Sequence, residues 1–253
     1  MQLLHHNQQG SGPNIILIHG LFGSLNNLNM VSNVLANDYT VTSVDVRNHG
    51  NSFHKNSMTY PEMAQDIINI MEHLRINNAH LLGHSMGGKI AMQCALSYSE
   101  KVNKLIVADI APVQYPAHHS DIIKGLQSID LSVTENRKAA DIQLSHYVKD
   151  IGVRQFLLKN LSTSNKKLTF KCNLDYINNA YKDIMLGLHN THSFNGETLF
   201  IKGGQSDYIV AKHRPKILAL FPKSKAKIIQ DAGHWLHAEK TLAFNKIVKD
   251  FLD

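Results

Sequence analysis

Residues 79–91 read AHLLGHSMGGKIA, and the pattern G-x-S-x-G occupies positions 83–87. The apolar run before the pattern predicts a buried strand, and the small and apolar residues after it predict a buried helix. A serine between such a strand and such a helix lies on a tight, strained turn, where small residues at Gly83 and Gly87 let the two backbones approach each other. We therefore predict that the Ser85 hydroxyl is held above a sheet, at the N-terminus of a helix, as a nucleophile.

Apolar runs like the one before Ser85 recur along the chain and alternate with helical stretches. They are rich in β-branched residues and end near small or polar residues, as buried parallel strands do; the runs are 15–18, 41–44, 105–108, 198–201 and 226–229. The segments 60–74 and 241–252 have the apolar periodicity of amphipathic helices. This alternation predicts an α/β fold with a mostly parallel central sheet flanked by helices.

The interval between residues 110 and 197 is too long for a single crossover between two strands. Four stretches within it look helical, namely 118–129, 134–149, 153–161 and 174–188. We interpret the interval as a helical cap inserted after the strand that ends at Asp109. The predicted boundaries are a core of residues 1–110 and 197–253 and a cap of residues 111–196, within a single domain overall.

The composition excludes several classes of protein. Of the 253 residues, 43% are hydrophobic and 18% are charged, which fits a folded globular chain rather than a disordered one. The net charge of +6 is spread along the chain, without the dense Lys/Arg runs of a nucleic-acid-binding arm. No apolar run approaches the ~18 residues that a membrane helix needs. We therefore expect neither a nucleic-acid partner nor stable insertion into a membrane.

The expected location follows from the N-terminus and the cysteines. The first residues, MQLLHHNQQGSGP, lack the charged and apolar regions of a signal peptide. Cys94 and Cys172 are too few for a disulfide framework and fit a reducing compartment. The sequence therefore predicts a cytoplasmic protein, and its oligomeric state stays open.

A serine hydroxyl is a poor nucleophile until an adjacent base takes its proton. The chain has 16 histidines, so composition alone does not select one of them. His234 follows the last predicted strand and precedes the C-terminal helix, which places it at the same edge of the sheet as Ser85. We predict that His234 is the base, and that the nearby His237 is a packing residue.

The third member of such a site is a carboxylate that orients the imidazole. The sequence offers two candidates. Asp207 follows the predicted strand 198–201, at the usual place of the acid in the order serine, acid, histidine. Asp109 ends the preceding predicted strand, from which an acid also reaches the histidine. Spacing favours Asp207 slightly and leaves Asp109 open.

The negative charge that forms on a substrate oxygen during attack needs hydrogen-bond donors that are already in place. We predict that the backbone N–H groups of Met86, directly after Ser85, and of Leu21, after the first buried strand, form this oxyanion hole. We also expect Phe22 and Tyr115 to line the pocket for an acyl group.

The pair His118 and His119 has the spacing of possible metal ligands. No Cys or Asp pattern of a metal site surrounds the pair. We interpret both side chains as solvated histidines of the cap, and we expect no metal.

The motifs together resemble the α/β-hydrolases, and specifically the YbfF-type bacterial esterases. The resemblance covers nearly the whole chain, is thinnest at about 130–195, and is carried by HGLFGS, DVRNHGNS, GHSMGG, ADIAPVQY, GGQSDY and AGHWLHAEK. It implies hydrolysis of carboxylic esters and acyl-CoA thioesters without metal or cofactor. It also implies that Asp109 is the acid and that Ser206 assists the histidine. In these relatives the position of Asp207 need not be acidic, so both aspartates stay candidates.

The leading interpretation is a serine hydrolase that forms an acyl-enzyme on Ser85 and acts on a small acyl ester or an acyl-CoA. Other chemistry on the same fold is an alternative, because a C–C bond hydrolase, a menaquinone-pathway-type lyase or a perhydrolase has the same three side chains. A ligand-binding receptor on this fold is the alternative from a different class.

Overall fold

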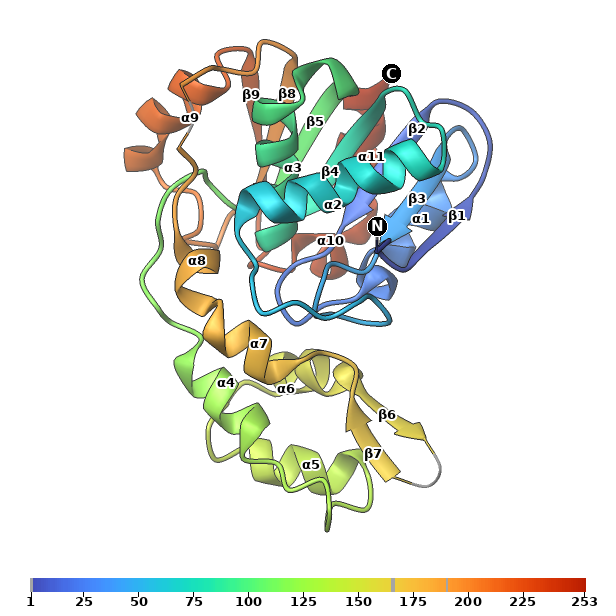
Figure 1. The fold of residues 1–253 in the computed structure, drawn as a ribbon. Coiled ribbons are helices and arrows are strands. Elements are labelled where there is room, and N and C mark those ends of the chain that lie inside the picture. The colour runs from blue at the N-terminus through green and yellow to red at the C-terminus, as the bar shows by residue number, and fades with distance from the viewer. Residues whose placement is uncertain (1, 165–166, 190) are drawn as a thin grey trace.

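The computed structural model describes residues 2–164, 167–189 and 191–253. In these residues a seven-stranded sheet has the order β1-β3-β2-β4-β5-β8-β9 (Figure 1). Its strands are β1 His6–Gln9, β2 Asn14–Ile18, β3 Thr40–Val44, β4 Ala79–His84, β5 Val102–Ala108, β8 Glu197–Gly203 and β9 Ser224–Ile229. Every pairing is parallel except that of β1 with β3. The predicted α/β fold with a mostly parallel sheet is confirmed.

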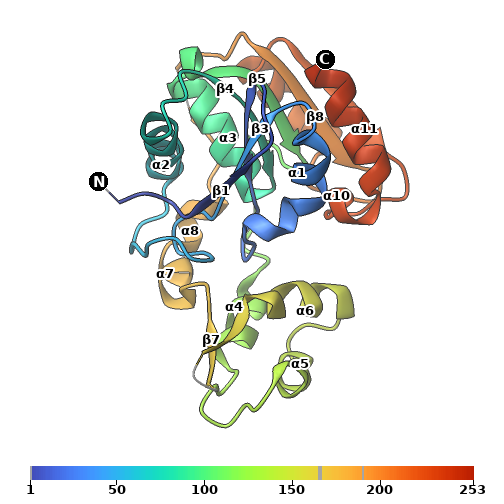
Figure 2. The same cartoon turned by 90° about the vertical axis from the view of Figure 1, so that its right-hand side faces the viewer.

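Helices cover both faces of this sheet (Figure 2). α2 (Tyr60–His73), α3 (Met86–Ser97) and α9 (Arg214–Leu220) pack on one face, and α1 (Asn29–Leu35), α10 (Leu236–Glu239) and α11 (Thr241–Leu252) pack on the other. Because side chains alternate along a strand, Ile16 and Ile18 of β2 join the core on the α3 side, whereas Ile15 and Leu17 join the core on the α11 side.

The long interval between β5 and β8 forms the cap, which lies beyond the carboxyl ends of the strands (Figure 1). Its helices are α4 Ser120–Gln127, α5 Arg137–Leu144, α6 Ile151–Leu157, α7 Leu174–Asn179 and α8 Tyr181–Met185. Each of the four stretches expected to be helical overlaps a helix; α4, α5, α7 and α8 lie within their stretches, and α6 begins two residues before the expected 153. We propose the boundaries 111 and 196 for this unit.

Four short helices of the 3-10 type complete the described elements. They are η1 Leu25–Leu28, η2 Ser99–Lys101, η3 Leu158–Asn160 and η4 Ala211–His213. η3 leads directly from α6 into the cap hairpin.

Two features of the fold were not predicted. The edge strand β1 reads HNQQ, and a polar strand at a sheet edge has no apolar run to reveal it. The cap also contains a two-stranded antiparallel hairpin, β6 (Leu161–Ser164) with β7 (Lys167–Phe170), where an entirely helical cap was expected. Such a short hairpin gains its stability from the helices around it, so its sequence carries little signal.

The cap is joined to the core beside the sheet edge by buried polar contacts. The Tyr60 hydroxyl of α2 donates to the Ile184 carbonyl at 2.6 Å, and the Lys89 ammonium of α3 donates to the Leu186 carbonyl at 2.5 Å. The Asn160 amide donates to the Phe22 carbonyl at 2.6 Å. These contacts hold the cap against the strand ends.

Two further observations concern the environment of the chain. No helix in the described parts of the chain has the length and apolarity that crossing a membrane requires. Cys94 and Cys172 are both free and buried, and burial raises the pKa of each thiol, that of Cys172 to about 12. They are therefore unreactive packing residues at neutral pH.

The turn between β4 and α3 has the tight geometry that the sequence predicts. Ser85 has a φ of 54°, in the left-handed region that non-glycine residues avoid. A Cβ atom on Gly83 would lie 2.1 Å from the Gly87 carbonyl oxygen, and one on Gly87 would lie 2.2 Å from the Ile18 carbonyl oxygen. Only glycine at both positions permits this approach of strand and helix.

We expect Gly83→Ala to lower the free energy of unfolding by about 2 kcal/mol or more, because the obstructing atoms are backbone atoms that cannot rotate away. Chemical denaturation measures this effect. The control is Gly152→Ala in the exposed part of α6, which should change stability by less than about 1 kcal/mol. Equal stability of Gly83→Ala and the wild type would contradict the backbone clash.

Candidate active site

Four side chains named in the sequence analysis come together beyond the carboxyl ends of four adjacent strands. Ser85 follows β4, Asp109 follows β5, Ser206 follows β8 and His234 follows β9. Carboxyl ends of neighbouring parallel strands share one edge of a sheet, which is why residues so far apart in the chain come together here.

Ser85, His234 and Asp109 form a continuous hydrogen-bonded chain. The Ser85 hydroxyl lies 2.9 Å from His234 Nε2, and His234 Nδ1 lies 2.8 Å from Asp109 Oδ2. With Nδ1 protonated and donating to the carboxylate, Nε2 is free to accept the serine proton. This is the geometry of an activated serine.

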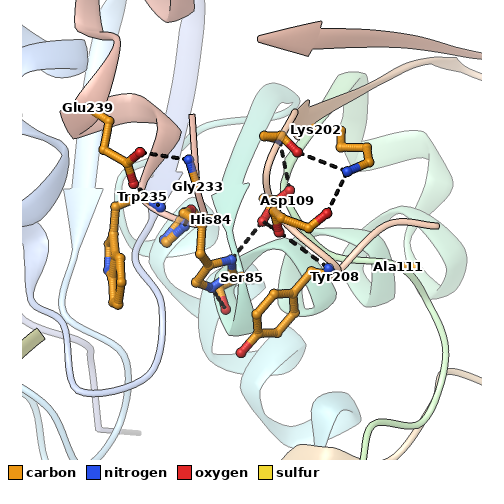
Figure 3. Close-up of polar contacts among 12 residues, drawn as sticks. His84, Ser85, Asp109, Ala111, Lys202, Tyr208, Gly233, Trp235 and Glu239 are labelled. Carbon is orange, nitrogen blue, oxygen red and sulfur yellow. Dashed lines mark hydrogen bonds and ion pairs between the residues drawn. The ribbon is translucent and has the colours of Figure 1, made fainter. Parts of the chain in front are cut away.

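The Asp109 carboxylate is completely buried and is oriented by donors from the loop after β8. Oδ1 accepts a hydrogen bond from the Gly203 N–H at 3.0 Å, and Oδ2 accepts one from the Ser206 hydroxyl as well as that from His234. The Lys202 ammonium in turn donates to the Ser206 carbonyl at 2.5 Å and to the Gly203 carbonyl at 2.9 Å, which fixes this loop (Figure 3). The carboxylate therefore has one available orientation, toward His234.

The structure does not bring Asp207, the other candidate acid, to the histidine. Its side chain is exposed, and no hydrogen bond joins it to His234 among the described residues. The turn after β8 directs the Ser206 side chain inward to Asp109, whereas the side chain of the next residue, Asp207, is exposed. The geometry therefore favours Asp109 as the acid, with Ser206 beside it.

The loop that carries His234 is held from two sides, which sequence reasoning did not foresee. The Glu239 carboxylate accepts hydrogen bonds from the Gly233 N–H at 2.6 Å and from the Trp235 N–H at 3.2 Å (Figure 3). The His84 Nε2 lies 2.8 Å from the His234 carbonyl oxygen. Burial lowers the pKa of His84 well below its usual value, so this ring is neutral and its Nε2–H donates. These contacts fix the backbone that presents the imidazole.

Leu21 and Met86, the predicted oxyanion donors, both line a cavity together with Ser85. Met86 opens α3, and the first N–H groups of a helix have no partner within it. In the loop after β2, the Phe22 N–H donates to His49 Nε2 at 3.1 Å and the Gly23 N–H donates to the Gly20 carbonyl at 3.0 Å. Within the described residues this leaves the Leu21 N–H without a partner. Leu21 and Met86 therefore fit the predicted roles.

Two buried neutral histidines hold the Leu21 loop in place. His19 Nε2 accepts a hydrogen bond from the Val46 N–H at 3.0 Å, and His49 Nε2 accepts the one from the Phe22 N–H. Burial is the main cause that lowers the pKa of His19, and it lowers that of His49 to about 3. Both rings are thus acceptors at neutral pH. Sequence reasoning missed these positioning roles; the available signal is a histidine directly after β2 and another in the loop that follows β3.

Two cavities meet at Ser85. We call the cavity of about 280 Å³ bounded by Phe22, Phe156, Trp235 and His234 the large compartment. The second, of about 20 Å³, is the small compartment, which is lined by residues that include Met86, Lys89, Tyr60, Tyr115 and Met185. Phe22 and Tyr115 therefore both line the site, but in different compartments.

The interpretation as solvated side chains is wrong for His119, which is largely buried, whereas His118 is exposed as expected. Both line the large compartment. His118 Nε2 lies 2.6 Å from the Tyr208 hydroxyl, and His119 Nδ1 lies 3.0 Å from the Tyr181 hydroxyl. Burial lowers the pKa of His119 to about 3, so it is neutral. Spacing along the sequence did not show that the start of the cap turns back over the strand ends.

No group of three or more His, Cys, Asp or Glu side chains in the described residues is arranged to hold a metal ion.

Tyr208 is a further residue of the site that the sequence analysis did not single out. Its ring stacks on the His234 imidazole, with centroids 3.9 Å apart and planes at 17° (Figure 3). The stack covers the face of the imidazole, while the hydroxyl contacts His118. Tyr208 is therefore a positioning residue for His234, and it connects His234 to the cap.

Comparison with known proteins identifies the family. The family model described as alpha/beta hydrolase fold matches residues 13–241. This chain belongs to the alpha/beta hydrolase family. It is 40% identical to a putative esterase/lipase of Haemophilus influenzae, over 95% of this chain and 83% of the relative.

Two further similarities confirm the resemblance to YbfF-type esterases. Esterase YbfF of Escherichia coli is 36% identical, over 98% of this hydrolase and 95% of the relative. The solved structure of a marine microorganism esterase superposes with a TM-score of 0.96 at 38% identity, over 99% of this hydrolase and all of that chain. The likeness therefore extends over the core and the cap.

We expect Asp109→Asn to lower kcat for ester hydrolysis by about 10³-fold or more, because an amide at this position favours the wrong tautomer of His234. Asp207→Asn, the matched control, should stay within about threefold of the wild type, since its side chain is exposed and apart from His234. Steady-state kinetics on a p-nitrophenyl ester measure both effects. A large loss in Asp207→Asn with a small one in Asp109→Asn would reverse the assignment.

We expect Tyr208→Ala to lower kcat by about 10- to 100-fold with a smaller change in KM, since an unsupported imidazole spends less time in the attacking geometry. Tyr208→Phe keeps the stacked ring and loses the hydroxyl contacts with His118 and His119, so it should retain most of the wild-type activity. If both variants lost the same activity, the hydroxyl rather than the stack would matter.

Proposed function

We propose that this protein is a serine hydrolase that cleaves carboxylic esters through an acyl-enzyme on Ser85. The hydrogen-bonded chain from Ser85 through His234 to the buried Asp109 is the observation that carries the proposal. The names of the relatives, which include esterases, support the same reaction class.

The first half of the reaction follows from the geometry. His234 Nε2 takes the Ser85 proton as the hydroxyl oxygen attacks the ester carbonyl carbon. The carbonyl oxygen becomes negative and accepts hydrogen bonds from the Leu21 and Met86 N–H groups. Asp109 holds the imidazolium that forms. Nε2–H then protonates the leaving oxygen, and an alcohol departs.

The second half repeats these steps with water. His234 takes a proton from a water molecule, which attacks the acyl-enzyme carbonyl at the position that the alcohol has left. The Ser85 oxygen then leaves, takes the proton back from Nε2, and the carboxylic acid is released. No step requires a group other than those of the chain, the substrate and water.

We extend the proposal to thioesters, including acyl-CoA. A thiol leaves from the same tetrahedral intermediate, and the acyl-enzyme is identical. The large compartment, with its volume of about 280 Å³ and its aromatic walls, has room for an extended leaving group. A cytoplasmic location stays a prediction.

Labelling by a fluorophosphonate probe tests the nucleophile, and turnover of p-nitrophenyl acetate tests the reaction. We expect the wild type to be labelled and to hydrolyse the ester, and Ser85→Ala to lose labelling and at least about 10³-fold in kcat. The control, Ser99→Ala, removes an exposed serine at the far end of α3 and should behave as the wild type.

The same experiment separates the alternatives. Labelling of Ser85 without turnover of any ester or acyl-CoA would indicate a C–C bond hydrolase, a lyase, a perhydrolase or a ligand-binding receptor on this fold. Absence of labelling would contradict an activated serine altogether.

A further inference from the structure

The two compartments that meet at Ser85 differ about tenfold in volume, about 280 Å³ against about 20 Å³. Ser85 and Leu21 line both of them. His234 lines only the large compartment, and Met86 lines only the small one. The two sides of the nucleophile are therefore chemically distinct.

This difference assigns the two halves of an ester to the two compartments. The leaving oxygen must lie within hydrogen-bond reach of His234 Nε2, because that atom protonates it. The leaving group therefore extends into the large compartment, along His234 and Trp235. The carbonyl oxygen points to the Leu21 and Met86 N–H groups. The remaining substituent of the carbonyl carbon, the acyl chain, then enters the small compartment.

Two core helices line part of the small compartment, α2 with Tyr60 and α3 with Met86 and Lys89. Lys89 of α3 lies with its ammonium nitrogen 4.9 Å from the centroid of the Tyr115 ring and 5.3 Å from that of Tyr60. A cation over two aromatic faces is stabilised by their negative electrostatic potential. Burial lowers the pKa of Lys89 to about 7. The two ring contacts and the hydrogen bond to the Leu186 carbonyl stabilise the charged form against this effect of burial.

The wall opposite these helices comes from the cap and is fixed to them. The Ile184 carbonyl accepts a hydrogen bond from the Tyr60 hydroxyl, and the Met185 carbonyl accepts one from the Tyr115 N–H at 3.0 Å. With Leu186 bonded to Lys89, core helices hold the carbonyls of residues 184 and 186, and Tyr115 at the start of the cap holds that of Met185. This wall cannot retreat without breaking buried hydrogen bonds, so the small compartment does not widen readily for a longer chain.

We propose that the small compartment limits the acyl group to about two or three carbons, since its volume holds about one methyl-sized group beyond the carbonyl, and that Ile184 and Met185 set this limit. The inference rests on the proposed function and names its substrate class. The substrates are acetyl and propionyl esters or thioesters of a larger, mainly apolar leaving group.

The test measures kcat/KM on p-nitrophenyl acetate, butyrate and octanoate, which share one leaving group. We expect the wild type to lose about tenfold or more from acetate to butyrate and to lose further on octanoate, because each added methylene meets fixed walls. Octanoate hydrolysis as fast as acetate hydrolysis would overturn the proposal. Failure to hydrolyse any of the three, without Ser85 labelling, would instead contradict the proposed function.

Variants of Ile184 and Met185 test whether these two residues limit the length of the acyl chain. Met185→Ala and the milder Ile184→Val should raise the ratio of butyrate to acetate activity by about tenfold and about threefold respectively. A ratio between two substrates does not depend on the fraction of folded protein, so moderate destabilisation does not hide the result. An unchanged ratio in both variants would show that these residues do not limit the acyl chain.

The matched control lies in the other compartment. Phe156→Ala widens the large compartment and should leave the butyrate-to-acetate ratio unchanged, while it alters the ratio between naphthyl acetate and methyl acetate. The opposite pattern, a changed acyl ratio in Phe156→Ala alone, would place the acyl chain in the large compartment and overturn the assignment.

Discussion

The close contact between β4 and α3 is the constraint on which the site depends. Because Gly83 and Gly87 lack side chains, α3 begins directly at the strand end and forces Ser85 to a φ of 54°. The same helix places the Met86 N–H beside the nucleophile and, one turn on, Lys89 in the lining of the small compartment. A single backbone approach thus positions the proposed nucleophile, a proposed oxyanion donor and part of the wall of the proposed acyl site.

The buried Asp109 carboxylate is the second constraint on the site, and Asp109 lies where the chain passes from the core into the cap. Its carboxylate is buried and satisfied by donors from the loop after β8 and by His234, so it orients the imidazole from within the sheet edge. The chain continues from it directly into the cap, which returns over the strand ends. Tyr208 contacts both His234 and His118, so it connects the His234 imidazole to the cap.

The elements that could be predicted are those with a strong local pattern. Six strands were predicted because buried parallel strands are continuous apolar runs, and α2 because its stripe of Met63, Ile67, Ile70 and Met71 is buried on one face. The edge strand β1 and the hairpin β6–β7 escaped prediction, since their stability comes from neighbours rather than from their own composition.

The sequence by itself determined the fold class and the two candidate side chains Ser85 and His234, because each follows a recognisable strand within a short motif. Spacing slightly favours Asp207, and only the tertiary structure favours Asp109, because Asp109 contacts His234 whereas the turn after β8 leaves Asp207 exposed. The stacked Tyr208 and the two unequal compartments are likewise tertiary. They arise where the cap meets the strand ends, from residues far apart in the chain, and no local pattern encodes such a meeting.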